Sequence, residues 1–212
     1  MKKNRSGSLK MAFTALFAAI ICVGCFIRIP IGAIPIVLQN ALCILSGVLI
    51  GGIAAGAPTA LFLIAGLIGL PVYSGGSSGL AVWLGPTGGF FPGYLIGAIL
   101  AGLIAGKPSV QEKNFSIPLL LRLALAMLLG MVILYVPGVI HFARWASGAG
   151  KVPADKTAFA YTMGACVLPF LPGDFLKFII CLPLALKIRP VIAQYLYAGK
   201  NTAGEESGNS AE

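Results

Sequence analysis

The sequence predicts an all-α integral membrane protein with six transmembrane helices, on two observations. Of its 212 residues, 58% are hydrophobic and 10% are charged, and the mean hydropathy is +0.95. A soluble protein of this length could not bury that much apolar surface in its core. The second observation is that the apolar residues are gathered into separate runs. We therefore expect lipid to be the main solvent of the chain.

The apolar runs set the number of spans. A bilayer core roughly 30 Å thick takes about 20 apolar residues per helix. Residues 201–212 are small and polar with no apolar period, which indicates a disordered tail after a single membrane domain at residues 1–200. The runs lie near residues 11–28, 36–53, 55–70, 89–106, 117–142 and 173–189.

The charges indicate how the chain is oriented. The formal net charge is +9, but the 15 Lys and Arg residues lie at the ends of the runs instead of forming one basic face, which argues against a nucleic-acid partner. Cytoplasmic flanks of membrane helices are enriched in Lys and Arg. Basic residues precede the first run, lie in the 106–117 connection and follow the last run. Both termini are therefore predicted to be cytoplasmic, in the cell membrane.

The connection from Pro71 to Gly88 is rich in Gly, Pro and Ser, and it predicts an ordered or lid-like loop. It offers hydroxyls and aromatic faces, a combination suited to a small ligand with apolar and polar parts. An aromatic residue of the membrane interface is an equal alternative for Trp83. The candidate ligand contacts in this loop are Tyr73, Ser77, Ser78, Trp83 and Thr87.

Two charges lie at the head of the last run. Asp174 and Lys177 are three residues apart, so their side chains project from one helix face. An ionisable residue in a span is costly and is by default a candidate functional residue. We expect Lys177 to donate to a ligand acceptor and Asp174 to accept from ligand N–H groups. The alternative is a structural ion pair that closes the helix terminus.

Other polar residues also lie in or near the spans. Gln39 lies among apolar residues, so it needs a hydrogen-bond partner; it could reach a cavity, and it is a candidate ligand contact. Arg28 ends the first run, where an interfacial role is favoured over ligand contact. His141 is expected to cap the fifth span. The moderately apolar segment 158–170 predicts a short helix in or near the outer interface.

Small residues form a stripe on the first run. Ala15 and Ala19 are four residues apart, and this spacing lets another helix approach closely. The stripe is a candidate partner interface. Packing within the subunit is an equal alternative.

Several kinds of chemistry are not supported. None of the Gly-Lys pairs has the spacing of a phosphate-binding loop, so we expect no ATP hydrolysis by this chain. The single histidine has no carboxylate cluster near it, so neither a metal nor another cofactor is expected. An intramembrane enzyme would need a second titratable group beside Asp174, and the spans offer only Lys177.

The motifs taken together resemble the BioY family, the biotin-specific S components. The likeness covers roughly residues 10 to 190, in order along the chain. Its most specific parts are Gly-Pro-Thr-Gly-Gly and Pro-Gly-Asp-x-x-Lys. The matching residues are Ile29-Pro30, Pro35, Gln39, Gly69-Leu70-Pro71-Val72, Ser74-Gly75-Gly76, Gly85-Pro86-Thr87-Gly88-Gly89 and Pro172-Gly173-Asp174-x-x-Lys177.

The resemblance implies an S-component fold that binds biotin from outside. It implies partners as well: a transmembrane coupling subunit (T component) and two ABC-type ATPases, which would use the ATP. It places Asp174 and Lys177 against the vitamin, a covering loop after Pro71, and Ala15 and Ala19 against the coupling subunit. An S component for a different small vitamin is the main alternative.

One motif departs from the family pattern. Some relatives carry Asn within a Gly-Gly-x-Gly-Gly segment, where this chain reads Gly-Gly-Ser-Ser-Gly. Whether Ser77 or Ser78 takes the place of that Asn is left open.

Overall fold

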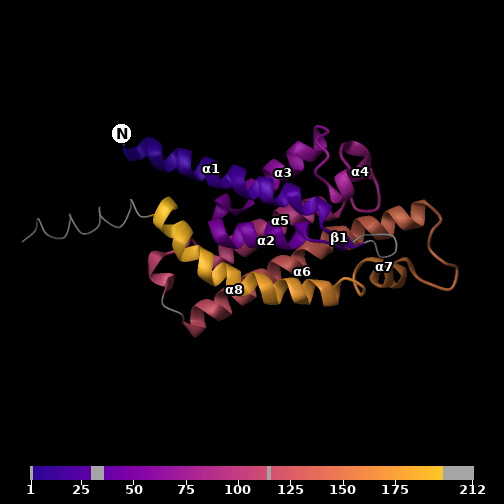
Figure 1. The fold of residues 1–212 in the computed structure, drawn as a ribbon. Coiled ribbons are helices and arrows are strands. Elements are labelled where there is room, and N and C mark those ends of the chain that lie inside the picture. The colour runs from indigo at the N-terminus through magenta and orange to yellow at the C-terminus, as the bar shows by residue number, and fades with distance from the viewer. Residues whose placement is uncertain (1, 30–35, 114–115, 198–212) are drawn as a thin grey trace, which may run out of the picture.

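The computed structural model describes residues 2–29, 36–113 and 116–197, and helices dominate these ranges. The longer helices lie lengthwise beside one another in a bundle (Figure 1). They coincide with the six predicted apolar runs. Helices of more than ten residues within the described ranges are α1 (Lys2–Val23), α2 (Gln39–Ile50), α3 (Ala57–Leu67), α5 (Phe90–Ala105), α6 (Ile117–Gly148) and α8 (Leu171–Leu196).

Shorter elements connect these helices. β1 (Arg28–Ile29) pairs antiparallel with β2 (Ile36–Val37), so a two-residue ribbon is the exception to the all-α prediction within the described ranges. The short helix predicted at 158–170 is present as α7 (Ala158–Cys166), and it meets α8 at a bend of 47°. The remaining short elements are η1 (Gly24–Phe26), η2 (Ile53–Gly56), η3 (Ser74–Gly76), α4 (Leu80–Leu84), η4 (Val110–Lys113) and α7 (Ala158–Cys166).

Helix length separates the clear membrane spans from the shorter ones. Gly7–Phe26 and Ile117–Gly148 are each long and apolar enough to cross a membrane, and the bent pair of α7 and α8 would make a third. The apolar helices Gln39–Ile50, Ile53–Leu67 and Phe90–Ala105 are shorter than 18 residues. The described residues therefore hold two or three clear spans, and the count of six stays a prediction. So does the single domain at 1–200, while the predicted tail at 201–212 lies outside the described residues.

The two ends of the bundle differ. The start of α1 and the end of α8 lie at one end, called here the terminal end, whereas α4, β1 and α7 lie at the other, called the loop end (Figure 1). Lys10 and Lys107 belong to the terminal end, where both border a space near Tyr197. That both termini are cytoplasmic stays a prediction.

The prediction that His141 caps the fifth span is wrong. α6 does not end near residue 142 but continues through Pro137 to Gly148, because residues 139–147 contain no proline or glycine that would end it. His141 therefore lies inside the helix, and its Nε2 donates to the Gly85 carbonyl oxygen over 2.8 Å. The side chain ties α6 to the turn that precedes α5.

Glycines allow α5 and α6 to pack closely. A Cβ atom added at Gly97 would lie 2.6 Å from the Gly130 carbonyl oxygen, and one added at Gly93 would overlap the Leu134 carbonyl. Gly93 and Gly97 are four residues apart, so both face the same neighbouring helix. Small residues at such a spacing permit close helix contact in lipid, where apolar side chains gain little by leaving the hydrocarbon.

A buried arginine secures the terminal end. Arg189 of α8 has no exposed surface, and its guanidinium donates to both carboxylate oxygens of Glu112, at 2.8 and 3.0 Å. It also donates to carbonyl oxygens at the ends of α2 and α5, those of Val48 and Ala105. Positive charge is favourable at a helix C-terminus because the last carbonyls lack helical partners. Arg189 thus joins α8 to η4, α2 and α5.

Replacing Arg189 by Met should destabilise the protein by about 3–5 kcal/mol, because it leaves the Glu112 carboxylate and two helix ends without their buried partner. Reversible unfolding in mixed detergent micelles measures this free energy. Arg122→Met is the control: Arg122 also pairs with Glu112, but its side chain is 47% exposed. An exposed pair contributes only about 0–1 kcal/mol. Equal effects of the two changes would contradict the assigned role of Arg189.

Candidate functional site

A cluster of four polar side chains lies at the loop end, centred on Asp174. This residue is in the first turn of α8, and only 6% of it is exposed. Its Oδ1 accepts from Lys177 Nζ at 2.8 Å and from Asn40 Nδ2 at 2.9 Å. Its Oδ2 accepts from the hydroxyl of Tyr135. Three helices, α2, α6 and α8, therefore meet at one carboxylate.

Lys177 completes this cluster. Its ammonium donates to Asp174, to Asn40 Oδ1 at 2.9 Å and to the backbone carbonyl of Val37 at 2.7 Å. The three N–H groups of the ammonium are thus matched by three acceptors. The side-chain exposures of Lys177 and Asp174 are 12% and 8%. The structure places the two predicted charges together, and a buried ion pair of this kind is stable only when its remaining hydrogen bonds are made.

Two members of the cluster were missed in the sequence. Asn40 directly follows Gln39 inside an apolar run, and an amide in such a run is a signal that could have been followed, since it needs partners once it is buried. In the structure Asn40 is 7% exposed. Tyr135 gave no such signal. It lies in the middle of a long apolar run, where an aromatic residue is ordinary, and only the packing of α6 against α8 brings its hydroxyl to Asp174.

One cavity lies against the cluster. Its volume is about 480 Å³, and it lies between α6 and α8. Asp174 and Tyr135 are polar residues of its lining, and its surface is almost entirely apolar, with side chains such as Met131 and Phe178. The arrangement of a few polar groups in an apolar space is typical of small-molecule sites.

Gln39 lies beside the cluster but is engaged elsewhere. It is 2% exposed, and its Nε2 donates to the carbonyls of Val72 at 2.7 Å and Ile21 at 3.3 Å. The predicted need for a hydrogen-bond partner is therefore met by α1 and by the loop after α3. Gln39 holds that loop against the start of α2.

Tyr73 and Trp83 hold the glycine-rich connection together. The Tyr73 hydroxyl donates to the Leu63 carbonyl at 2.6 Å and accepts from Trp83 Nε1 at 2.9 Å, and the ring stacks on Phe91 with centroids 4.4 Å apart. Burial raises the pKa of the Tyr73 phenol above its ordinary value, and the Trp83 hydrogen bond opposes that rise. The phenol therefore stays a neutral donor. An added Cβ at Gly66 would overlap the Tyr73 ring, so the glycine makes room for it.

The remaining loop candidates differ in their contacts. Ser77 Oγ donates to the Ser74 carbonyl at 3.0 Å, within the loop itself. Ser78 and Thr87 are half-buried, and their hydroxyls make no hydrogen bond to another described residue. These two side chains are at the same end of the bundle as Asp174 and remain candidates for ligand contact.

The Gly-Pro-Thr-Gly-Gly motif has a packing role. A Cβ at Gly88 would overlap the Trp83 carbonyl, and one at Gly89 would overlap His141. Both glycines are buried, and His141 also binds the Gly85 carbonyl. The motif therefore fits a tight turn between α4 and α5 against α6.

Ala15 and Ala19 lie on an exposed face of α1, whereas Ala18 is 4% exposed and packs inward. The described residues leave both alanines uncovered. Within these residues no group of three His, Cys, Asp or Glu side chains could hold a metal ion.

The comparisons with known proteins agree in fold and in class. A crystal structure described as the S-component for biotin from an ECF-type ABC transporter matches with a TM-score of 0.69 and 26% identity, over 89% of this chain and 94% of that one. A protein named biotin transporter BioY from Rhodobacter capsulatus is 35% identical over 78% of this chain and 85% of its own length. A second protein of that name, from Rhizobium etli, is 32% identical over 87% of this chain and 94% of its own length.

The fold and the relatives define a membrane transporter subunit, and not an enzyme. The BioY family model matches residues 1–194. The chain belongs to the BioY family. The resemblance drawn from its motifs is thus confirmed, while the roles predicted for individual site residues stay predictions.

Tyr73→Phe should lower the free energy of unfolding by about 1–3 kcal/mol, since it removes a donor to the Leu63 carbonyl and leaves Trp83 Nε1 without its acceptor in a partly buried place. Thermal unfolding in detergent checks this. Tyr195→Phe, which loses the same hydroxyl from a residue that is 57% exposed, should change little. A Tyr73→Phe protein as stable as the wild type would show that the loop is not held by this bond.

Proposed function

We propose that this chain is the biotin-binding membrane subunit of an ECF-type vitamin uptake transporter. It captures biotin from outside and delivers it inward with the help of an ATP-driven coupling module. The observation that carries the proposal is the buried cluster of Asp174, Lys177, Asn40 and Tyr135 in a chain of this family. The names of the relatives and of the solved S-component support the choice of vitamin.

The chemistry of biotin suits the cluster. Biotin has an apolar bicyclic ring and tail with polar groups at both ends: a urea that donates two N–H bonds and a carboxylate that accepts. Asp174 is an acceptor for the urea N–H groups, and Lys177 is a donor to a ligand oxygen. Apolar walls next to these groups, like those of the 480 Å³ cavity, match the ring and tail.

Ligand binding at this place involves an exchange of partners. Lys177 already donates three hydrogen bonds and Asp174 accepts three within the chain. A biotin oxygen that meets Lys177 takes the place of Val37 or Asn40 as acceptor, and a urea N–H takes the place of a donor to Asp174. Among the described loop residues, Ser78 and Thr87 are half-buried hydroxyls without a hydrogen bond in the protein, as is the more deeply placed Ser74 hydroxyl, so their bonding capacity is open to the ligand.

The proposed placement is a multi-pass protein of the cell membrane with six spans and both termini in the cytoplasm. The six helices of more than ten residues in the described ranges support the count, with α2, α3 and α5 as the short ones. The terminal end carries Lys10, Lys107, Lys113 and Lys187, as the cytoplasmic side of a membrane protein would. The loop end, with Asp174, then faces outward.

The proposed partners are a transmembrane coupling subunit and two ABC-type ATPases. The chain has no phosphate-binding loop in its sequence, so the energy of ATP hydrolysis must come from other subunits. Ala15 and Ala19 leave an exposed, smooth stretch of α1 against which a helix of the coupling subunit can pack. No resident cofactor is proposed.

Biotin binding by the purified subunit, measured by calorimetry, tests the site. Asp174→Asn and Lys177→Ala should each weaken binding about 100-fold, because a hydrogen bond to a charged group contributes up to about 3 kcal/mol and each 1.4 kcal/mol is tenfold. Tyr135→Phe, which keeps the ring, should weaken it about tenfold through loss of one donor to Asp174.

The chain offers matched controls at the same end. Asp155→Asn and Lys156→Ala make the same chemical changes at exposed positions and should leave binding unchanged. A wild-type protein that is monodisperse but ignores biotin would overturn the choice of ligand, and a panel of other vitamins would follow. Full binding by both Asp174 and Lys177 variants would instead move the site into the glycine-rich connection.

A larger residue on the exposed face of α1 should separate binding from assembly. Ala19→Leu is expected to leave biotin binding by the isolated subunit unchanged but to reduce co-purification with the coupling module, because the added side chain keeps the partner helix away. Ala160→Leu, the same change at an exposed position on α7, is the control. Normal assembly of the Ala19→Leu protein would place the partner elsewhere.

A further inference from the structure

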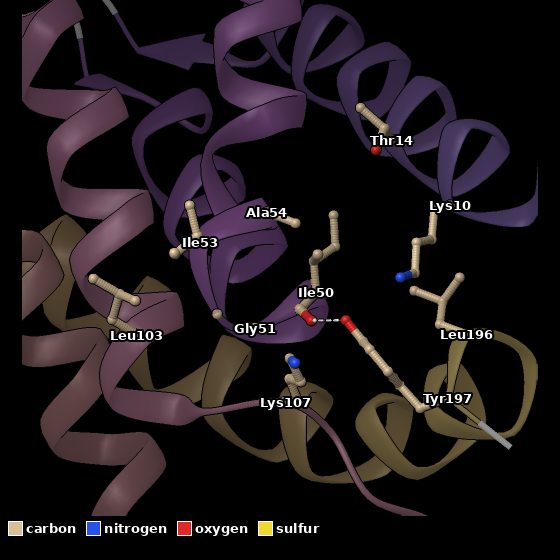
Figure 2. A pocket seen from close by; sticks show the side chains of 11 residues that line it. Lys10, Thr14, Ile50, Gly51, Ile53, Ala54, Leu103, Lys107, Leu196 and Tyr197 are labelled. Carbon is tan, nitrogen blue, oxygen red and sulfur yellow. Dashed lines mark hydrogen bonds between the residues drawn. The ribbon is translucent and has the colours of Figure 1, made fainter. Parts of the chain in front are cut away.

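A second pocket lies at the terminal end, far from the Asp174 cluster. Its volume is about 350 Å³, and α1, the end of α2, η2 and the end of α8 border it. Figure 2 shows the side chains of Lys10, Lys107 and Thr14 directed toward this space. Volumes of roughly 300–1,000 Å³ are usual for small-molecule sites.

The pocket carries positive charge that the described residues do not balance. Neither Lys10 nor Lys107 has a carboxylate within 4.0 Å among residues 7–29, 37–113 and 116–197. In that part of the chain Glu112 is taken by arginines and Asp174 by Lys177. The Lys10 ammonium lies instead over the Tyr197 ring, 5.6 Å from its centroid. Two lysines at one pocket favour an anionic occupant.

Hydrogen bonds within the protein fix the walls of the pocket, and they occupy the polar groups of those walls. The Tyr197 hydroxyl donates to the Ile50 carbonyl at 3.0 Å, which joins the end of α8 to the end of α2. The N–H groups of Gly51 and Gly52 donate to carbonyls at 2.9 and 2.8 Å. Gly51 has a φ of +69°, and a Cβ there would overlap the Gly106 carbonyl. The side chains left to meet a ligand are therefore Lys10, Lys107 and Thr14.

The rim of the pocket is apolar and open. Ile53 and Leu103 both line it and are 83% and 51% exposed. In a membrane such side chains contact acyl chains, and basic groups beside them sit at the level of the headgroups. A ligand that fits both features has an anionic head and hydrocarbon tails.

We propose that this pocket binds the phosphate headgroup of an anionic phospholipid, with Lys10 and Lys107 as the cationic contacts, Thr14 as a neutral donor and the acyl chains along Ile53 and Leu103. The inference rests on the membrane placement given above but not on the choice of biotin as ligand. A lipid in this position would join α1 to the ends of α2 and α8.

Native mass spectrometry of the full-length protein, delipidated in detergent, tests this proposal. The protein is titrated with phosphatidylglycerol, phosphatidylcholine and inorganic phosphate. Phosphatidylglycerol should bind in preference to phosphatidylcholine. Lys10→Gln with Lys107→Gln should weaken that binding about 25-fold, since each lysine near an anionic lipid contributes roughly a fivefold factor. Lys113→Gln with Lys187→Gln removes the same charge outside the pocket and should have little effect.

Several results would overturn the proposal. Equal losses in the two double variants would mean general surface attraction, and equal binding of inorganic phosphate would mean a free-anion site. The double variant Glu205→Gln, Glu206→Gln tests whether the acidic C-terminal segment fills the pocket. If it raises lipid affinity as much as the two pocket lysine changes lower it, that segment is the occupant of the pocket. If the pocket variant binds lipid normally but no longer assembles with the coupling subunit, the surface docks protein. Calorimetry with biotin on the same samples separates this outcome from failure of the proposed function.

Discussion

The absence of water in the bilayer core is the constraint on which the rest of this structure depends. A polar group there has to find its partner within the protein, since an unsatisfied one costs several kcal/mol. The few charged side chains that the described helices bury obey this rule: Asp174 is enclosed by Lys177, Asn40 and Tyr135, and Arg189 by Glu112 and helix carbonyls. Each buried charge therefore fixes the helices around it.

These two sets of contacts join the helices at opposite ends of the bundle. The Asp174 cluster joins α2, α6 and α8 at the loop end, while Arg189 joins α2, α5 and α8 at the terminal end. Between them α5 and α6 pack through Gly93, Gly97 and Gly130, where no polar contact is needed. The middle of the bundle is thus held by close backbone packing, and its chemistry is confined to the ends.

Much of this could be predicted from the sequence, because membrane helices are long apolar runs and intramembrane charges are rare. The helices of the described ranges, the Asp174–Lys177 pair and the family motifs all carried such signals. The partners of the pair did not. Tyr135 has no local signal, since its place at Asp174 depends on how α6 lies against α8. Arg189 appeared as a topology charge, and its burial follows only from the ends of α2 and α5 meeting beside it.

The three bonds of the Lys177 ammonium have a consequence for selectivity. Because the chain's own acceptors already satisfy this charge, an incoming molecule gains little from its polar atoms alone. A molecule that displaces Val37 or Asn40 without offering an equivalent acceptor leaves the ammonium with an unsatisfied hydrogen-bond donor in a largely buried site. The free energy that this costs exceeds what apolar contact contributes. Discrimination at such a site comes from the rejection of imperfect mimics more than from attraction of the right compound.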